Sequence, residues 1–227
     1  MTAALPAAVL LDMDGLLVDT ERIWFEVESA IVSDLGGAWT DEDHDLLVGG
    51  PLERAVAHMV ATTPAAADPA DVTERLLREM VAALRRGPVE WMPGAKLLLA
   101  TIADAGVPAA LVSSSRRPIV DAVLDAIGRE SFQVTVSGDD VTHTKPSPDP
   151  YLHAAALLGV DVRRCVAVED SLTGATSARS AGCVTVLVPS VPDLPAEVLA
   201  RVAHRCLDTL TGLDLAGLSD LMGSASP

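Results

Sequence analysis

The residues of this chain that could carry chemistry begin with a pair of aspartates near the N-terminus. Asp12 and Asp14 follow the apolar run Ala7–Leu11, and Gly15 comes directly after them. Two carboxylates two residues apart at a strand end can face the same pocket, and a glycine allows the backbone to turn sharply there. A single aspartate after a strand is often only a turn or capping residue. The pair followed by glycine therefore favours a reactive or metal-binding site.

Three further segments hold polar residues of the kinds that bind anions or metals. Each also has an ordinary structural interpretation, because a serine often caps a helix and acidic residues stabilise a helix N-terminus. A lysine in a proline-rich loop is usually solvated, but this chain has only two lysines, Lys96 and Lys145, so the loop lysine is a candidate for chemistry. The three segments are Ser113–Ser115, Lys145–Pro150 and Glu169-Asp170.

Short apolar runs alternate with helix-length segments, and this alternation indicates how the polar residues are positioned. Continuous apolar strands separated by helices indicate a parallel sheet that is covered on both faces. Ligand sites in such sheets lie beyond the carboxyl ends of the strands, where Asp12, Ser113 and Glu169 occur. The fold class is therefore α/β. We predict strands at Ala7–Leu11, Val107–Val112, Gln133–Ser137, Cys165–Val168 and Val184–Val188.

One long segment breaks the alternation. Residues 20–86 contain no convincing strand and have a helical pattern throughout, and residues 87–94 look like a linker that returns to the sheet. An all-helical insert after the first strand predicts a small cap domain over the site. The predicted core is residues 1–19 and 88–227, and the predicted cap is residues 20–87. The predicted helices of the cap are Glu21–Leu35, Pro51–Ala61 and Ala70–Arg86.

Composition excludes several classes of partner. The chain has 16 basic and 32 acidic residues, a formal net charge of −16, which leaves little from which to build a basic face for nucleic acid or an anionic membrane. A hydrophobic fraction of 49% is enough for a folded core, and only six residues are aromatic, so that core must consist of aliphatic side chains. No apolar run approaches the roughly 20 residues that span a membrane. We expect a cytoplasmic monomer.

Other groups are interpreted as structural. The cysteines have no metal-like spacing, and two of them lie in or beside valine-rich runs, as small buried hydrophobic residues do. The acidic run Asp41–Asp45 is interpreted as a solvated loop or a helix start rather than a metal site. The histidines form no recognisable cluster; they are His44, His58, His143, His153 and His204.

Taken together, four segments resemble the four motifs of the haloacid dehalogenase-like hydrolase superfamily, in the order found in that family. They span residues 9–182, about three quarters of the chain. The resemblance implies a Rossmann-like three-layer core, a helical cap between the first two motifs, and Mg²⁺-dependent phosphoryl transfer. The four segments are Leu11–Glu21, Leu111–Ser115, Lys145–Pro150, and Val168–Ser171 with Gly174, Ala178, Ala181 and Gly182.

The resemblance also implies roles for the acidic residues. Asp12 would be the nucleophile that forms an aspartyl-phosphate intermediate, and Asp14 would be the general acid and base. The carboxylates of Asp12 and Asp170, with the backbone carbonyl of Asp14, would hold Mg²⁺, which prefers oxygen ligands. Glu169 would be an outer or water-mediated ligand.

Three residues would bind the phosphoryl group by the same resemblance. The Ser113 hydroxyl and the backbone N–H of Ser114 would donate hydrogen bonds to its oxygens. Lys145 would supply the positive charge that stabilises the transferring group. Together with Mg²⁺ this lysine would supply +3 against the −4 of the acidic residues in the site, so the sequence predicts an absolute metal requirement.

Departures from related branches narrow the activity. Dehalogenases of this fold lack the second aspartate, and phosphonatases use a cap lysine that is absent from residues 20–86. Sugar-phosphate mutases carry a cap histidine and a cap arginine, whereas this chain has Trp24 and Leu52 near those positions. Residues 20–24 look more like the sugar- and polyol-phosphate phosphatases. Hydrolysis of a small phosphorylated metabolite is therefore favoured, with a β-phosphoglucomutase-like mutase as the alternative.

The cap sequence identifies neither the substrate nor the physiological pathway. Trp24, Arg54 and Arg116 are candidate substrate contacts, and their ordinary interpretations are packing for the tryptophan and solvated charge for the arginines. A remote alternative is a protein that binds a phosphorylated metabolite without turnover. The intact Asp12 and Lys145 argue against it.

Overall fold

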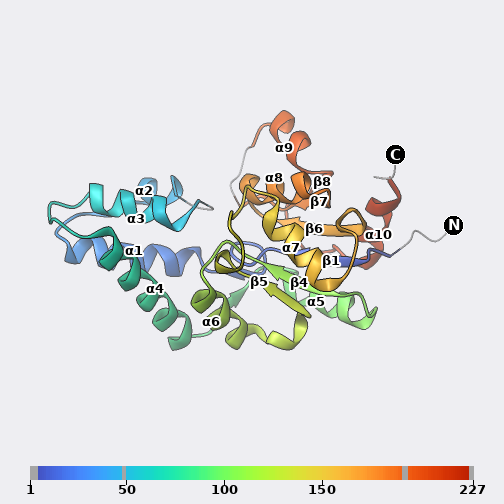
Figure 1. Cartoon of the computed structure of the whole chain (residues 1–227), viewed down its shortest axis with the longest axis horizontal. Helices are drawn as coiled ribbons and strands as arrows, with labels where there is room; N and C mark the ends of the chain where they lie inside the picture. The colour runs from blue at the N-terminus through green and yellow to red at the C-terminus, as the bar shows by residue number, and fades with distance from the viewer. Residues whose placement is uncertain (1–4, 48–49, 191–193, 225–227) are drawn as a thin grey trace. The chain divides into compact units, whose positions relative to one another are not determined.

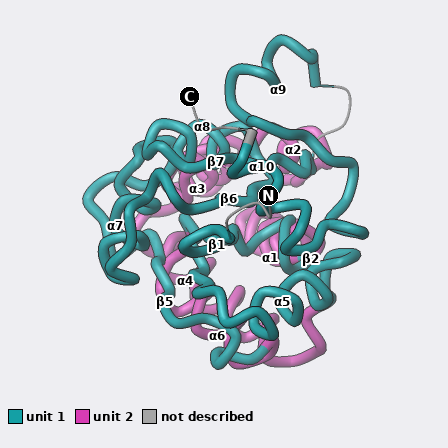
Figure 2. The backbone as a smooth tube through the Cα atoms, turned by 90° about the vertical axis from the view of Figure 1, so that its right-hand side faces the viewer, with its two compact units in different colours: residues 1–19, 90–114, 128–227 teal, residues 20–89, 115–127 magenta. Residues whose placement is uncertain are grey.

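The computed structural model describes residues 5–47, 50–190 and 194–224. The chain divides into two compact units, coloured separately in Figure 2. We call residues 1–19, 90–114 and 128–227 the sheet unit, and residues 20–89 and 115–127 the helical unit. Residues 115–127, which the sequence prediction placed in the core, group with the helical unit. The boundaries of core and cap as functional domains stay a prediction.

The sheet unit is built on a parallel sheet, which confirms the predicted α/β Rossmann-like fold (Figure 1). Within the described residues this sheet has six strands in the order β5-β4-β1-β6-β7-β8. Every adjacent pair is parallel. The strands are β1 (Ala8–Leu11), β4 (Ala109–Val112), β5 (Val134–Val136), β6 (Cys165–Glu169), β7 (Val184–Leu187) and β8 (Arg205–Cys206).

Burial on both faces explains why these short apolar runs form the sheet. All residues of β1, β4, β6 and β7 are buried, as expected when helices cover both faces. Helices α7 (Asp149–Leu158) and α8 (Leu172–Ala181) contribute alanines and Tyr151 to the cluster on one face. Helices α5 (Ala95–Asp104) and α10 (Leu215–Ser224) lie on the other side of the sheet from α7 (Figure 2). The small side chains of this core agree with the low aromatic content.

A second, two-stranded sheet corrects the prediction of a plain linker at residues 87–94. Strand β2 (Val18–Asp19) pairs antiparallel with β3 (Glu90–Trp91), with Val18 opposite Trp91. The segments on either side of the helical insert are therefore joined by backbone hydrogen bonds. The remaining short elements of the sheet unit are α9 (Ala196–Val202) and 3₁₀ turns at Arg129–Ser131, Gly138–Asp140 and Val162–Arg164.

The helical unit consists of α1 (Glu21–Asp34), α2 (Asp41–Asp45), α3 (Leu52–Ala61), α4 (Pro69–Arg86) and α6 (Arg117–Ile127). The acidic run starts a helix, as predicted, because Thr40 and Asp43 form a capping box around its first turn. The Asp68 side chain caps α4 by accepting a hydrogen bond from the Ala70 N–H, and proline occupies the first position of that helix. The amphipathic helix α4 buries Val72, Leu76 and Met80 on one face.

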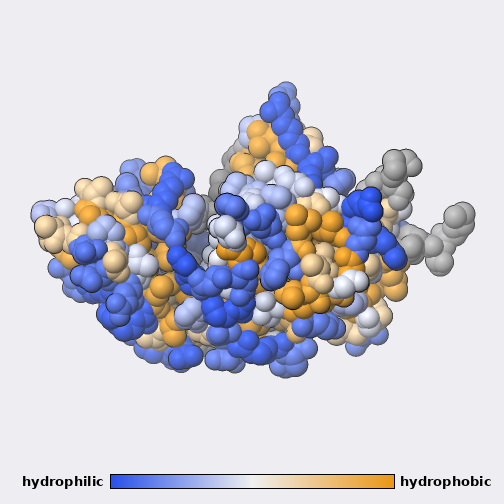
Figure 3. All heavy atoms as spheres, in the orientation of Figure 1, coloured by the Kyte–Doolittle hydropathy of each residue, from blue (hydrophilic) through white to orange (hydrophobic). Residues whose placement is uncertain are grey.

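The remaining expectations about side chains are borne out in part. Cys165 and Cys183 are buried free thiols, as predicted, whereas Cys206 is exposed. Hydrophobic side chains gather over α7 in Figure 3, where Leu152 and Leu157 are exposed. In the part of the chain that the structure describes, no helix is long and apolar enough to cross a membrane.

Candidate active site

The central strand and its two neighbours bring the predicted acidic and hydroxyl residues to one edge of the sheet. Asp12 follows β1, Ser113 follows β4, and Glu169 ends β6 with Asp170 directly after it. Because β1 lies between β4 and β6, the carboxyl ends of all three strands meet at this edge. Crevices at this edge are the usual ligand sites of open α/β sheets.

The turn after β1 places Asp14 and permits the close approach of Asp170. The Gly15 N–H donates to the Val18 carbonyl at 2.9 Å, and Gly15 has a φ of +75°. A Cβ at this position would overlap the Asp170 carboxylate. Glycine is therefore required here both by the left-handed backbone and by the neighbouring acid.

Ser113 contacts the second aspartate of the turn. Its hydroxyl donates to Oδ2 of Asp14 at 3.3 Å, so the end of β4 is linked to the turn after β1. Ser113 is buried, whereas Ser114 is exposed at the start of the following loop. The hydroxyl that the sequence assigned to a phosphoryl oxygen thus lies beside the proposed acid and base.

Lys145 lies in the interior, where its ammonium faces two carboxylates. It contacts Asp12, lies 2.6 Å from Oε1 of Glu169, and donates to the Val112 carbonyl at 2.9 Å. Burial alone would lower the pKa of Lys145, but the Asp12 and Glu169 carboxylates outweigh burial and raise this pKa above its ordinary value. The lysine therefore stays charged at the point where the first and third motifs meet.

Glu169 and Asp170 lie in surroundings that raise the pKa of each carboxyl group. Burial raises the pKa of Glu169 to about 7, even though Lys145 opposes the change. Burial, followed by the charges of Asp12 and Glu169, raises the pKa of Asp170 well above its ordinary value. Perturbed carboxyl groups of this kind are characteristic of functional sites, because like charges are costly to bring together.

This cluster has the donor set of a site for a hard divalent cation. One carboxylate oxygen from each of Asp12, Glu169 and Asp170 lies within 4.8 Å of the others, and all three residues are buried. Carboxylate oxygens are the ligands that Mg²⁺ takes in proteins. A cation would also offset the repulsion among these acids, so the residues fit the predicted metal.

Tyr151, for which the sequence pattern predicted no role, completes the cluster. Tyr151 is fully buried in the first turns of α7, and its hydroxyl donates to Oε1 of Glu169. Its ring lies below the Lys145 ammonium, with 5.5 Å between the nitrogen and the ring centroid. The available signal was that the chain's single tyrosine directly follows the segment Lys145–Pro150.

Comparison with known proteins decides the family. The family model for haloacid dehalogenase-like hydrolases matches residues 9–188. The chain belongs to this family. It is 33% identical over 193 residues to the protein CbbY of Rhodobacter capsulatus, covering 81% of this chain and 85% of that protein. It is 32% identical over 217 residues to hexitol phosphatase B of Escherichia coli strain K12, covering 92% and 96% of the two chains.

A solved structure agrees with this assignment. A variant of CbbY from Rhodobacter sphaeroides in complex with xylulose-(1,5)bisphosphate superposes with a TM-score of 0.83 at 31% identity. The superposition covers 94% of this hydrolase and 99% of CbbY. The resemblance stated from the four motifs is confirmed, including its closeness to sugar phosphatases.

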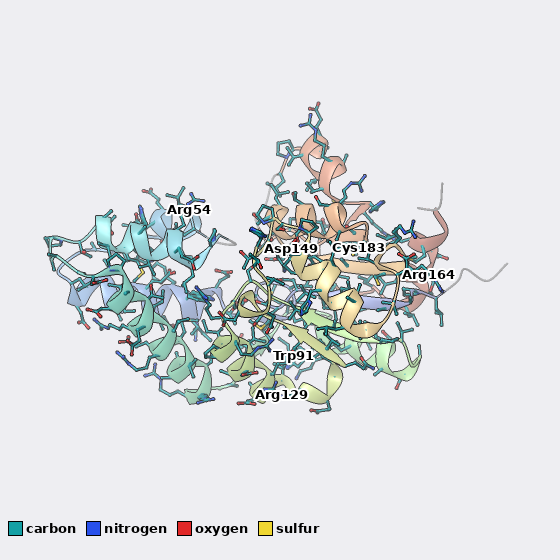
Figure 4. All side chains as sticks on the ribbon, in the orientation of Figure 1. Arg54, Trp91, Arg129, Asp149, Arg164 and Cys183 are labelled. Atoms are coloured by element: carbon teal, nitrogen blue, oxygen red, sulfur yellow. The ribbon has the colours of Figure 1, made fainter. Side chains whose placement is uncertain are left out.

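The candidate substrate residues of the hydrolase all lie in the helical unit. Trp24 is half-buried on α1, and Arg54 is exposed on α3 (Figure 4). Arg116 precedes α6, and its guanidinium donates to Oε1 of Glu53 at 2.8 Å. Both side chains of this pair are exposed, so it contributes little to stability. The roles of Trp24, Arg54 and Arg116 stay predictions.

The helical unit of the hydrolase also holds a buried polar network that the sequence did not reveal. His44 lies between two acids of α1, with Nδ1 2.9 Å from Glu28 and Nε2 3.3 Å from Glu21. The indole N–H of Trp39 donates to the same Glu28 oxygen at 3.2 Å. This network fixes the segment after α1 against that helix, which is a structural role for His44.

Proposed function

We propose that this chain is a Mg²⁺-dependent phosphatase that hydrolyses a small phosphate monoester, a sugar or polyol phosphate, through an aspartyl-phosphate intermediate. It is a phosphoric monoester hydrolase of the haloacid dehalogenase-like family. The observation that carries the proposal is the position of Asp12. This carboxylate follows the central strand, contacts the Lys145 ammonium, and belongs to the buried cluster with Glu169 and Asp170.

In the first step, a carboxylate oxygen of Asp12 attacks the phosphorus atom of the substrate. The new bond between Asp12 and phosphorus forms while the bond from phosphorus to the alcohol oxygen breaks, and the leaving oxygen takes that electron pair. Asp14 donates a proton to the leaving oxygen. Lys145 stabilises the negative charge of the transferring group, since its ammonium is fixed and shielded from water.

In the second step, water cleaves the intermediate. Asp14, now a carboxylate, accepts a proton from the attacking water, whose oxygen bonds to phosphorus as the bond to Asp12 breaks. Inorganic phosphate leaves and Asp12 is restored. Asp14 lies at the edge of the sheet, with its Oδ2 3.3 Å from the Ser113 hydroxyl.

The proposed metal ligands are the carboxylates of Asp12 and Asp170 and the backbone carbonyl of Asp14, with Glu169 as an outer ligand. Mg²⁺ supplies the positive charge that lets a carboxylate approach a phosphate dianion. The proposed phosphate contacts are the Ser113 hydroxyl, the Ser114 backbone N–H and Lys145.

The relatives support the proposed substrate class. CbbY binds a ketose bisphosphate and hexitol phosphatase B is named for a polyol phosphate, which supports a phosphorylated sugar or polyol for this chain. Trp24, Arg54 and Arg116 are the side chains that we propose contact the part of the substrate away from the phosphate. Cytoplasmic location and a monomeric state stay predictions.

A panel of phosphorylated sugars and polyols, with release of inorganic phosphate as the readout, tests the proposal. We expect Mg²⁺-dependent hydrolysis by the wild type and its loss in Asp12→Asn. Asp104→Asn removes an exposed acid at the end of α5 and is the matched control, with wild-type rates. Equal rates for Asp12→Asn and Asp104→Asn would exclude Asp12 as the nucleophile.

The same assay separates the alternatives. Isomerisation of β-glucose 1-phosphate to the 6-phosphate with a bisphosphate primer, without release of phosphate, would identify a mutase. Binding of phosphorylated sugars without turnover of any of them would identify a binding protein. Either result would overturn the proposed hydrolysis.

A further inference from the structure

The hydroxyl of Tyr151 and the ammonium of Lys145 contact the same oxygen atom. Tyr151 donates to Oε1 of Glu169, and Lys145 Nζ lies 2.6 Å from that oxygen. All three side chains are buried, so none of these contacts competes with water. Hydrogen bonds to a charged group in such surroundings are stronger and more directional than those at a surface.

Three protein acceptors surround the Lys145 ammonium. An ammonium has three N–H groups, and Lys145 faces Asp12, Glu169 and the carbonyl of Val112. The direction of the ammonium is thus set by three fixed acceptors. Two of these acceptors, Asp12 and the Val112 carbonyl, lie at the carboxyl ends of β1 and β4. The third is the Glu169 side chain, whose orientation depends on its own contacts.

Glu169 is held on each side. Its Oε1 receives Tyr151 and Lys145, and its Oε2 lies 3.5 Å from the Ser171 hydroxyl, a long contact. A Cβ at Gly174 would overlap this carboxylate, so α8 approaches it as closely as a glycine allows. Both short contacts of Glu169 are therefore made by its Oε1. Of the two partners, Lys145 is a proposed phosphate ligand, whereas Tyr151 is neither a proposed phosphate ligand nor a proposed metal ligand.

We propose that Tyr151 is a positioning residue, whose hydroxyl fixes Glu169 as an outer ligand of the metal site and thereby aims the Lys145 ammonium at Asp12. The Tyr151 hydroxyl is the donor of this contact and the Glu169 oxygen is the acceptor. The inference rests on the proposed function, because it concerns the metal and the lysine of that same site.

The variant Tyr151→Phe tests the hydroxyl alone, since it keeps the ring beneath Lys145. Partners that hold metal-site carboxylates typically change metal affinity or activity by 10–100-fold when removed. We expect the dissociation constant for Mg²⁺, measured by calorimetry without substrate, to rise about tenfold. We also expect kcat to fall about tenfold with KM changed less than about twofold, because the hydroxyl acts on the reacting groups and not on the substrate.

A matched control separates positioning from general loss of a buried hydrogen bond. Thr185→Val also removes a fully buried hydroxyl in an isosteric change, and this hydroxyl donates to the Cys183 carbonyl at 3.2 Å, away from the acids. We expect Thr185→Val to keep wild-type Mg²⁺ affinity and kcat. If both variants changed Mg²⁺ affinity by the same factor, Tyr151 would have only a structural role.

A double-mutant cycle identifies the route of the effect. In a Glu169→Gln background, Tyr151→Phe should change Mg²⁺ affinity by less than about twofold, because residues that act through one another are not additive. The full tenfold effect in that background would overturn the proposal. A wild type that binds Mg²⁺ and hydrolyses phosphate esters, with an unchanged Tyr151→Phe variant, would refute this inference alone. A wild type that does neither would refute the proposed function.

Discussion

The ammonium of Lys145 lies 2.6 Å from Oε1 of Glu169, and both side chains are shielded from solvent, with exposed fractions of 5% and 0%. A buried ion pair adds little net stability, because both charges must lose their water. Breaking such a pair is different, since the remaining charge is left buried without a partner. The pair therefore makes Lys145 necessary for the fold as well as for the proposed chemistry.

Replacing Lys145 with methionine should lower the free energy of unfolding by about 3–5 kcal/mol near pH 8 and reduce hydrolysis more than about hundredfold. The stability loss should shrink toward pH 5. Glu169 has a folded pKa of about 7, above its ordinary value, and this pKa rises further without the lysine, so the acid is already neutral at low pH. Urea unfolding across this pH range measures the effect.

Lys96→Met is the matched control for that substitution. Lys96 is the chain's other lysine, exposed on α5 with its ammonium 5.3 Å from the Trp91 ring centroid. Lys96→Met should lower the free energy of unfolding by at most about 1 kcal/mol and leave the activity unchanged. Equal stability and activity in the two methionine variants would contradict the role given to Lys145.

The strand pattern was sufficient to predict most of the sheet edge and its acids. Asp12, Ser113 and Glu169 each follow or end a short apolar run, and parallel strands bring their carboxyl ends together whatever lies between them. The contacts of Lys145 and Tyr151 with Glu169 could not be predicted in this way. Lys145 lies 24 positions and Tyr151 18 positions before Glu169 in the sequence, and only the folding of the loop and of α7 against the sheet brings them together. The sequence has no local pattern for such contacts.

The elements that were missed share a physical reason. Strands β2 and β3 have two residues each, too few for a period-two pattern, and they pair across the 70 residues of chain that lie between them. His44 was correctly interpreted as structural, but its acidic partners on α1 depend on the fold of the segment after that helix. Helix α6 has an ordinary amphipathic sequence, and only its contacts group it with the helical unit.

Gly15→Ala should damage the metal site, and Gly159→Ala should not. Both glycines have positive φ values, +75° and +69°, so alanine costs about 1–2 kcal/mol of stability at either position. A Cβ at Gly159 meets nothing within 4 Å, whereas one at Gly15 overlaps the Asp170 carboxylate. We expect weaker Mg²⁺ binding by calorimetry for Gly15→Ala alone. Unchanged Mg²⁺ affinity in that variant would argue against Asp170 as a ligand.

His44 should make the stability of the helical unit depend on pH. The hydrogen bond to Glu21 and, against the opposing effect of burial, the hydrogen bond to Glu28 raise the pKa of His44 to about 9. Because the folded pKa lies above the unfolded value, the contribution is complete below about pH 6.5 and is lost as the pH rises through about 9. His44→Gln should cost about 2 kcal/mol of unfolding free energy near pH 6, progressively less between about pH 6.5 and pH 9, and little above pH 9.

Urea unfolding of the wild type and His44→Gln at matched pH values measures the difference in their free energy of unfolding as a function of pH. His143→Gln is the control, because His143 is exposed and its ring faces Asp149 at 3.0 Å on the surface. Its difference from the wild type should be small at every pH. Parallel curves for the wild type and His44→Gln would show that the Glu21–His44–Glu28 network does not hold a charged histidine.

Mg²⁺ should stabilise the chain against unfolding even without substrate. The acids of the cluster are destabilised by their proximity, as the raised pKa of Asp170 indicates, and a cation bound only by the folded state removes that cost. At a free concentration about 100 times the dissociation constant, the gain is about 2.7 kcal/mol. The gain should be smaller at low pH, because protons then occupy the carboxylates that the metal requires.

Thermal unfolding with MgCl₂, compared with NaCl of equal ionic strength, measures this gain in stability. Asp170→Asn should lose most of the gain, while Asp104→Asn should keep it. An equal shift of the unfolding temperature with both salts would show that the carboxylates of Asp12, Glu169 and Asp170 hold no divalent cation.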